Sequence, residues 1–438
     1  MGNSKIVFDD VRKIFSRGKD FKNTFLWIAL LTFLSGAIRK WVFTSGSVGN
    51  FILLIQLLLP FLISLKHNQF SLPSRQKIFR FYIFYLIISS FNPLNHSLFH
   101  GLLGFVLYLG FWWLITYYYE NRQYIDIRPL IPTFIYFCSF EIALGFLQYQ
   151  LPADHFLNKY AAIEQLGNDQ VIASVGNAVR ITGSFSYISG YTSFLIFAIL
   201  FIWTLIRAGY NSKIIAFLFS GILVVTLMTG SRGSALFTLI IFLLIIFSEF
   251  NLVTIIGFLR SLLFPIILMA FLFAFKGLSG FESTINNAFS NFEERRTINA
   301  QSGEQEQRIF SDLNELVIDY RGKYPLFGVG LGATYQGATV VFGTSDYVKE
   351  YGYYEGELPR IVLEAGFIML VFRFALFFWL LSWLELNKLS KFVCFFVFTY
   401  GIGNTFNIYN AIFLALGLIF LDNIALKNKQ EQFEILKG

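Results

Sequence analysis

The sequences RIFSDLNELVIDYRGKYPLFGVGLG (residues 308–332) and YYEGELPRIVLEAG (residues 353–366) belong to a polar segment from about Lys276 to Arg360. Long apolar runs precede and follow this segment, and most of the remaining chain is hydrophobic enough to lie in lipid. A polar loop of this length on such a body is where water-soluble chemistry takes place. The segment therefore predicts a membrane domain into which one large loop is inserted.

The composition excludes an ordinary soluble globular protein. Of the 438 residues, 55% are hydrophobic, 19% are aromatic and 14% are charged, whereas soluble domains carry roughly 25% charged residues. Several apolar runs reach the roughly 20 residues that cross a hydrocarbon core of about 30 Å. The runs are continuous, unlike the short alternating segments of a β-barrel. We therefore predict an all-α, polytopic membrane protein, with residues 1–438 as a single membrane domain.

Twelve transmembrane helices fit the apolar runs best. They are predicted at about 24–43, 48–65, 79–92, 98–118, 130–150, 187–207, 213–229, 233–249, 257–275, 358–384, 391–406 and 408–424. Residues 276–357 then form the large loop between spans 9 and 10, and residues 151–186 form a smaller segment between spans 5 and 6.

The positions of lysine and arginine predict the orientation in the membrane. The short gaps TSGSVGN, NPLNHSLFHG and GNTFNIYN contain neither residue, whereas the gaps on the other side contain several. Since cations stay on the cytoplasmic side, both termini are expected in the cytoplasm and both polar segments outside. The net charge of +7 therefore reflects orientation and does not indicate binding to nucleic acid.

Three arginines are expected together on the outer face. Arg180 begins RITGSFSY, Arg232 lies in TGSRGS between two spans, and Arg308 begins an amphipathic stretch of the large loop. A guanidinium at the mouth of two apolar helices is costly without an anionic partner, and a helix that starts after Arg232 directs N–H groups outward. We hypothesise that the three bind a phosphate group. For Arg232, the alternative is an arginine at the membrane interface that lipid headgroups bind.

Two further cations, Arg39 and Lys40, end the first span on the outer side, against the trend. A cation inside a span costs roughly 3 kcal/mol on insertion scales. Either both side chains extend to the outer interface, or they clamp a lipid-linked pyrophosphate. Glu141 and Arg373, also within spans, are expected to be paired structurally.

A group of carboxylates precedes and enters span 10. The group consists of Glu355, Glu357 and Glu364, together with Arg360. Spacings of three and four residues place Glu357, Arg360 and Glu364 on one helix face. One interpretation is an ion-paired helix start. The other is a site in which a partly desolvated carboxylate accepts a proton. No residues have the spacing of a metal site.

Taken together, these motifs resemble the O-antigen polymerase and O-antigen ligase superfamily of membrane glycosyltransferases. Arg180 with TGSF, TGSRG around Arg232, Arg308 followed by PLFGVGLG, and LPRIVLEAG ending at Gly366 occur in the family's order. The resemblance implies transfer of an undecaprenyl-diphosphate-linked glycan to an acceptor on the periplasmic face of the bacterial inner membrane, without nucleotide sugar, metal or other cofactor. It also implies that Arg180, Arg232 and Arg308 hold the donor diphosphate.

One departure from the family pattern concerns the acceptor. Ligases of this family commonly have a histidine nine residues before the acid of the E-x-G ending, and here that position is Glu355. This favours an O-antigen or exopolysaccharide polymerase, which extends another lipid-linked repeat unit, over a ligase, which transfers glycan to lipid A core or protein. Glu355 or Glu357 is expected as the base, with Arg360 and Glu364 setting position and charge. A chain-length regulator or another polysaccharide-assembly protein is expected as a partner.

A transporter of lipid-linked oligosaccharides is the alternative from another class. Twelve spans suit a flippase, but transporters place polar residues near the middle of the membrane. Here the ionisable groups are expected at one outer face, which favours the enzyme.

Overall fold

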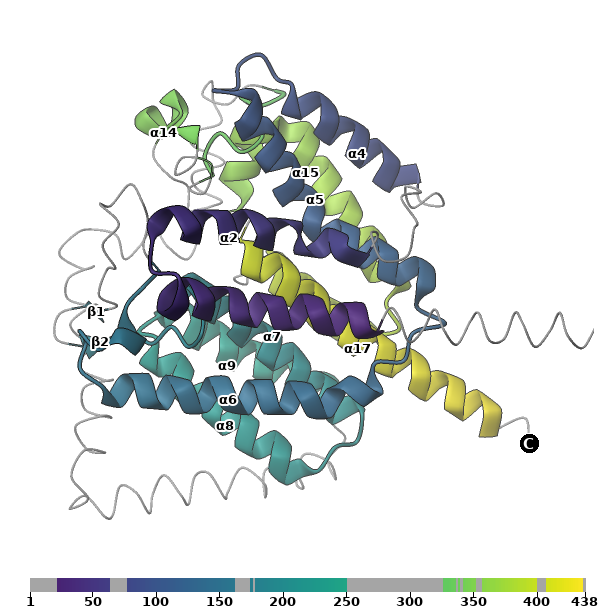
Figure 1. The fold of residues 1–438 in the computed structure, drawn as a ribbon. Coiled ribbons are helices and arrows are strands. Elements are labelled where there is room, and N and C mark those ends of the chain that lie inside the picture. The colour runs from purple at the N-terminus through teal and green to yellow at the C-terminus, as the bar shows by residue number, and fades with distance from the viewer. Residues whose placement is uncertain are drawn as a thin grey trace, which may run out of the picture.

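The computed structural model describes residues 22–63, 77–161, 174–175, 178–249, 326–335, 338, 342–351, 357–399 and 407–435. In these ranges the only strands are β1 (Ser174–Val175) and β2 (Ala178–Val179), which pair antiparallel. All other regular structure in them is helical (Figure 1). The predicted helical class is therefore confirmed for this part of the chain.

The helices coincide with the apolar runs of the sequence. The first begins at Lys22 and ends in a π-helical turn, η1 (Ile38–Val42). The remaining helices are α2 (Gly46–Leu58), η2 (Leu59–Phe61), α4 (Lys77–Ser90), α5 (Leu98–Asn121), η3 (Arg128–Leu130), α6 (Ile131–Gln150), η4 (Phe156–Asn158), α7 (Ile188–Arg207), α8 (Ser212–Met228), α9 (Arg232–Glu249), α14 (Asp346–Tyr351), α15 (Glu357–Trp383), α16 (Lys388–Thr399) and α17 (Ile408–Ile435).

Within the described residues, six helices are long and apolar enough to cross a membrane. They are Lys22–Val42, α5, Arg128–Gln150, α7, α15 and α17. Every predicted span except 257–275 coincides at least partly with a helix. The span at 257–275 and most of the large loop lie outside the described residues, so the count of twelve stays a prediction.

Two helices, α7 and α17, form the centre of the bundle. They pack along each other, and the most apolar stretch of α17 is entirely buried. Phenylalanine rings fill the space around them: the Phe413 ring centre lies 5.1 Å from that of Phe33 and 5.6 Å from that of Phe197. Such tilted and edge-on ring pairs are favourable beyond the area they bury. The 55 phenylalanines of the sequence thus supply much of the core.

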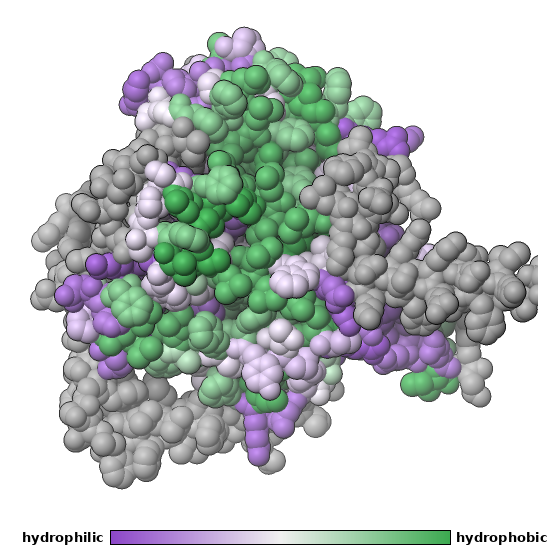
Figure 2. Space-filling view, in the orientation of Figure 1, coloured by the Kyte–Doolittle hydropathy of each residue, from purple (hydrophilic) through white to green (hydrophobic). Residues whose placement is uncertain are grey.

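The outer face of α4 is apolar and exposed. Phe81, Phe84 and Ile88 are exposed and recur at three- and four-residue spacing, so they share one helix face. Figure 2 shows hydrophobic side chains over the part of the molecule that holds α4 and α2. In a helix of a membrane protein, such a face is the one that contacts lipid.

The bundle has two chemically different ends (Figure 1). The C-terminus lies at one end, where Asn428 donates to the Arg207 carbonyl and Lys427 to the Gln123 carbonyl. The opposite end carries β1, β2 and α14 and is called the loop end below. Gaps predicted to share one side of the membrane therefore lie together, while the sidedness itself stays a prediction.

Candidate functional site

The loop of residues 180–187 joins β2 to α7 and is buried from Ile181 to Ser186. Its turn is at Gly183, whose φ of 54° is favourable only for glycine. Two side chains of α6 bind this turn. Glu141 accepts hydrogen bonds from the N–H and hydroxyl of Ser184, and Gln148 accepts from the N–H of Gly183 at 2.8 Å. The loop is therefore fixed by a transmembrane helix.

This loop enters the helical bundle. Glu141 lies nine residues before the end of α6 at Gln150, which at 1.5 Å per residue is about 13 Å below that end. Ser184 is therefore well inside the bundle. Irregular backbone at membrane depth is tolerated where protein buries it or where it lines a cavity, so the 180–187 loop is a candidate functional element.

The two cations of the first span bind the same loop. Arg39 donates to the Ser186 hydroxyl at 3.1 Å, and Lys40 donates to the Thr182 hydroxyl at 2.7 Å and to the Gly183 carbonyl at 3.0 Å. Both side chains are buried, so neither extends to an interface. The Arg39 Nε atom has no hydrogen-bond partner among the described residues, whereas Lys40 is engaged by the protein itself.

The structure brings two of the three predicted arginine motifs together. Arg180 donates from Nε to the carbonyl of Thr229 at 3.1 Å, and Thr229 begins the turn that leads into α9 at Arg232. The turn and the 180–187 loop are thus neighbours at the loop end. Arg308 and Glu355 lie outside the described residues.

A second irregular segment, residues 326–335, packs against α5 and the turn before it. Gly328, Gly330 and Gly332 all have positive φ. A Cβ atom at Gly332 would collide with the α5 backbone. The side-chain amides of Asn92 and Asn95, both in the turn before α5, each donate to a loop carbonyl at 2.9 Å. The glycine run of the sequence therefore allows close packing of backbone on backbone.

Glu364 of α15 anchors this second segment. Its carboxylate accepts from the N–H of Gly332 at 3.1 Å and from the N–H and hydroxyl of Thr334 at 2.9 and 2.6 Å. The Tyr108 hydroxyl of α5 donates to it at 3.1 Å. Arg360 completes the set, with its Nε atom 3.4 Å from the carboxylate. With five donors, Glu364 is occupied by the protein and acts as an anchor.

The helix α15 is broken two residues later. Gly366 has φ 72° and ψ −178°, a conformation that only glycine adopts readily. The break lets Glu357 pair with Arg373, although 16 residues of straight helix would separate them by about 24 Å. Arg360 pairs with Glu364 four residues on, in line with the interpretation of an ion-paired helix start, while Glu357 pairs with Arg373.

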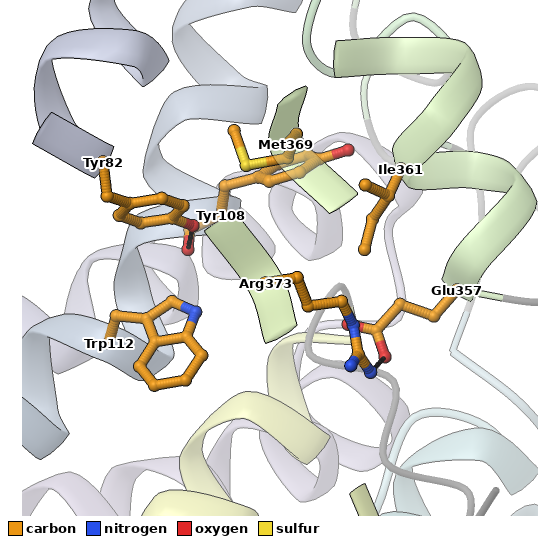
Figure 3. Close-up of a pocket in the computed structure, with 7 residues that line it drawn as sticks. All are labelled: Tyr82, Tyr108, Trp112, Glu357, Ile361, Met369 and Arg373. Carbon is orange, nitrogen blue, oxygen red and sulfur yellow. Dashed lines mark hydrogen bonds and ion pairs between the residues drawn. The ribbon is translucent and has the colours of Figure 1, made fainter. Parts of the chain in front are cut away.

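Glu357 and Arg373 line a small cavity between α4, α5 and α15 (Figure 3). Their side chains point toward one another, and the rings of Tyr82, Tyr108 and Trp112 enclose the other side. The cavity volume is about 10 Å³, which is room for about one water molecule. It is too small for a sugar, so Glu357 is tied to a structural pair within the bundle. Glu141 and Arg373 both have structural partners, as expected, but these are Ser184 and Glu357, respectively.

Arg360 of α15 also contacts the end of the second irregular segment. The guanidinium carbon of Arg360 lies 5.5 Å from the centre of the Tyr335 ring. Burial raises the pKa of Tyr335 to about 12, whereas the nearby positive charges of Arg360 and Arg39 act in the opposite direction. The hydroxyl is therefore a proton donor at neutral pH.

Sequence reasoning missed Gln148 and Tyr335. Gln148 follows Glu141 by seven residues, two helical turns, so a shared helix face was the available signal. No sequence signal pointed to Tyr335, because its position depends on the backbone conformation of residues 326–335. Among the described residues, no group of three or more His, Cys, Asp or Glu side chains is arranged to hold a metal ion.

The chain matches no protein-family model, no curated protein and no solved structure. The resemblance to the polymerase and ligase superfamily therefore rests on the sequence motifs alone.

Proposed function

We propose that this protein is a polysaccharide polymerase of the bacterial inner membrane. It transfers an undecaprenyl-diphosphate-linked glycan to a sugar hydroxyl of another lipid-linked repeat unit, on the outer face. The observation that carries the proposal is that two irregular loops, residues 180–187 and 326–335, are each held by a buried carboxylate of a helix and adjoin buried cations. Arg39 binds the first loop at Ser186, and Arg360 lies 5.5 Å from the Tyr335 ring of the second. Irregular backbone and buried cations at membrane depth are characteristic of binding sites for anionic substrates.

The donor diphosphate is assigned to the arginine motifs. Arg180 and the turn before Arg232 adjoin each other. Arg308 is assigned to the same site because its motif follows theirs in the family's order. Guanidinium groups bind phosphate through paired, charge-assisted hydrogen bonds. They also stabilise the charge that develops on the leaving lipid diphosphate. Arg39 is kept as a further phosphate ligand because its Nε atom has no partner among the described residues.

The acceptor hydroxyl requires a base. Its oxygen attacks the anomeric carbon of the donor, the bond from that carbon to the diphosphate oxygen breaks, and the hydroxyl proton passes to a carboxylate. Glu357 is a poor choice because its carboxylate is engaged by Arg373. We therefore assign the base to Glu355, and assign support of the site to Glu357, Arg360 and Glu364.

Deletion of the protein in its own bacterium tests this function. A polymerase deletion leaves single repeat units on the outer face, with no polymer. Lipid-linked repeats trapped on the cytoplasmic face would instead show a flippase. Polymer that stays on the lipid carrier and does not reach its final acceptor would show a ligase. Either of these two phenotypes contradicts the proposal.

A further inference from the structure

Three buried polar side chains surround the turn at Gly183. Glu141 and Gln148 lie two turns apart on one face of α6, and Lys40 ends the first span. All three are almost completely buried. Polar and charged groups in apolar spans are costly unless they are fully bonded. The hydrogen bonds of these three side chains show which part of the loop each one fixes.

Gln148 is bonded only to backbone. Its Oε1 atom accepts from the N–H groups of Thr182 at 3.1 Å and Gly183 at 2.8 Å. Its Nε2 atom donates to the carbonyls of Gly183 at 2.9 Å and Leu157 at 2.8 Å. These four bonds use the whole capacity of an amide side chain. Gln148 is therefore a template for the backbone of the turn.

Glu141 and Lys40 complete the enclosure from two sides. Glu141 accepts hydrogen bonds from the N–H and the hydroxyl of Ser184. Lys40 binds the Thr182 hydroxyl and shares the Gly183 carbonyl with Gln148. Lys40 and Glu141 thus carry opposite charges and bind adjacent residues of one buried turn.

The turn positions an arginine of the proposed site. Arg180 lies two residues before Thr182 and bonds to the carbonyl of Thr229. A shift of the turn therefore shifts the guanidinium relative to a bound diphosphate.

We propose that Lys40, Glu141 and Gln148 form a positioning frame that sets the backbone of residues 182–184 and, through it, the place of Arg180. In this assignment Lys40 serves the loop and is not a phosphate ligand. The inference rests on the proposed function and deepens it.

Amide hydrogen exchange in the purified, detergent-solubilised protein tests the frame without reference to activity. Gln148→Leu removes the acceptor of two loop N–H groups, so we expect exchange in residues 180–187 to become at least about tenfold faster. Gln56→Leu is the matched control, because this buried glutamine of α2 has no hydrogen-bond partner among the described residues. Unchanged exchange in Gln148→Leu overturns the proposal.

Two measurements on Lys40→Met separate positioning from phosphate binding. In a polymerisation assay with lipid-diphosphate-linked repeats, Lys40→Met is expected to lower kcat/KM at least about tenfold. It is also expected to speed amide exchange in residues 180–187, as Gln148→Leu does, because the bonds to Thr182 and Gly183 are lost. A loss of kcat/KM in Lys40→Met with unchanged exchange overturns the assignment of Lys40 to the loop.

These outcomes are distinct from failure of the proposed function. If the unchanged protein forms no polymer from the repeats, the function is wrong, whatever the exchange data show. If it forms polymer and Gln148→Leu loosens the loop without lowering kcat/KM, the function stands and the frame has no part in it.

Discussion

Thr334 donates two hydrogen bonds to Glu364, one from its backbone N–H and one from its hydroxyl, at 2.9 and 2.6 Å. Ser184 binds Glu141 through the same two groups. In each loop, a glycine of positive φ lies one or two residues before the donor. The 180–187 loop and the 326–335 segment are thus attached to transmembrane helices by the same pair of hydrogen bonds, from a hydroxyl residue to a buried glutamate. The E-x-G motif carries one of these anchors.

Glu364→Gln is expected to destabilise the protein by about 3–5 kcal/mol, the range for breaking a buried charge pair. The substitution leaves Arg360 without its carboxylate and turns an amide N–H₂ toward donors of the 326–335 segment. Thermal unfolding in detergent measures the loss. An unchanged melting temperature would show that the segment does not depend on this anchor.

Substitution of Gly366 by alanine tests the break in α15. An added Cβ there collides with the backbone of Leu326 and Phe327, and φ is 72°. Gly209 has a similar φ of 67° but no atom within 4 Å. Gly209→Ala is therefore expected to cost only the conformational term, about 1–2 kcal/mol, and Gly366→Ala clearly more. Equal melting temperatures for the two variants would contradict the close approach.

The helices were predictable from the sequence because continuous apolar runs have few other possible structures. The pairing of Arg360 with Glu364 was likewise predictable from their spacing of four. The partner of Glu357 was not, since it depends on the backbone break at Gly366, which spacing does not reveal. The hydrogen bonds of Lys40 could not be predicted either, because its acceptors lie in a loop more than a hundred residues away in the sequence.

The pairing of Glu357 with Arg373 gives a second test of buried charge. Arg373→Met is expected to lower stability by about 3–5 kcal/mol because it removes one member of a buried ion pair. Adding Glu357→Gln is expected to restore most of that loss. A cycle of unfolding measurements on the two single variants and the double variant gives the coupling. Additive losses would mean that the two side chains do not interact.

At the opposite end, Asp422 accepts from the Glu385 N–H at 2.7 Å and from the Tyr118 hydroxyl at 2.9 Å, and lies 3.6 Å from Arg122. Asp422→Asn is expected to cost about 1–3 kcal/mol of stability. Because this cluster lies away from the loop end, polymer formed per folded molecule should stay unchanged. A loss of specific activity at unchanged stability would place part of the site there.

The most direct test of the phosphate assignment is polymer formation by purified protein from defined lipid-diphosphate-linked repeats, with Arg180→Ala, Arg232→Ala and Arg308→Ala compared with Gln56→Leu. We expect each arginine variant to fold and to lose activity by about a hundredfold or more, while Gln56→Leu keeps it. Undiminished polymer formation in the three arginine variants would contradict the account.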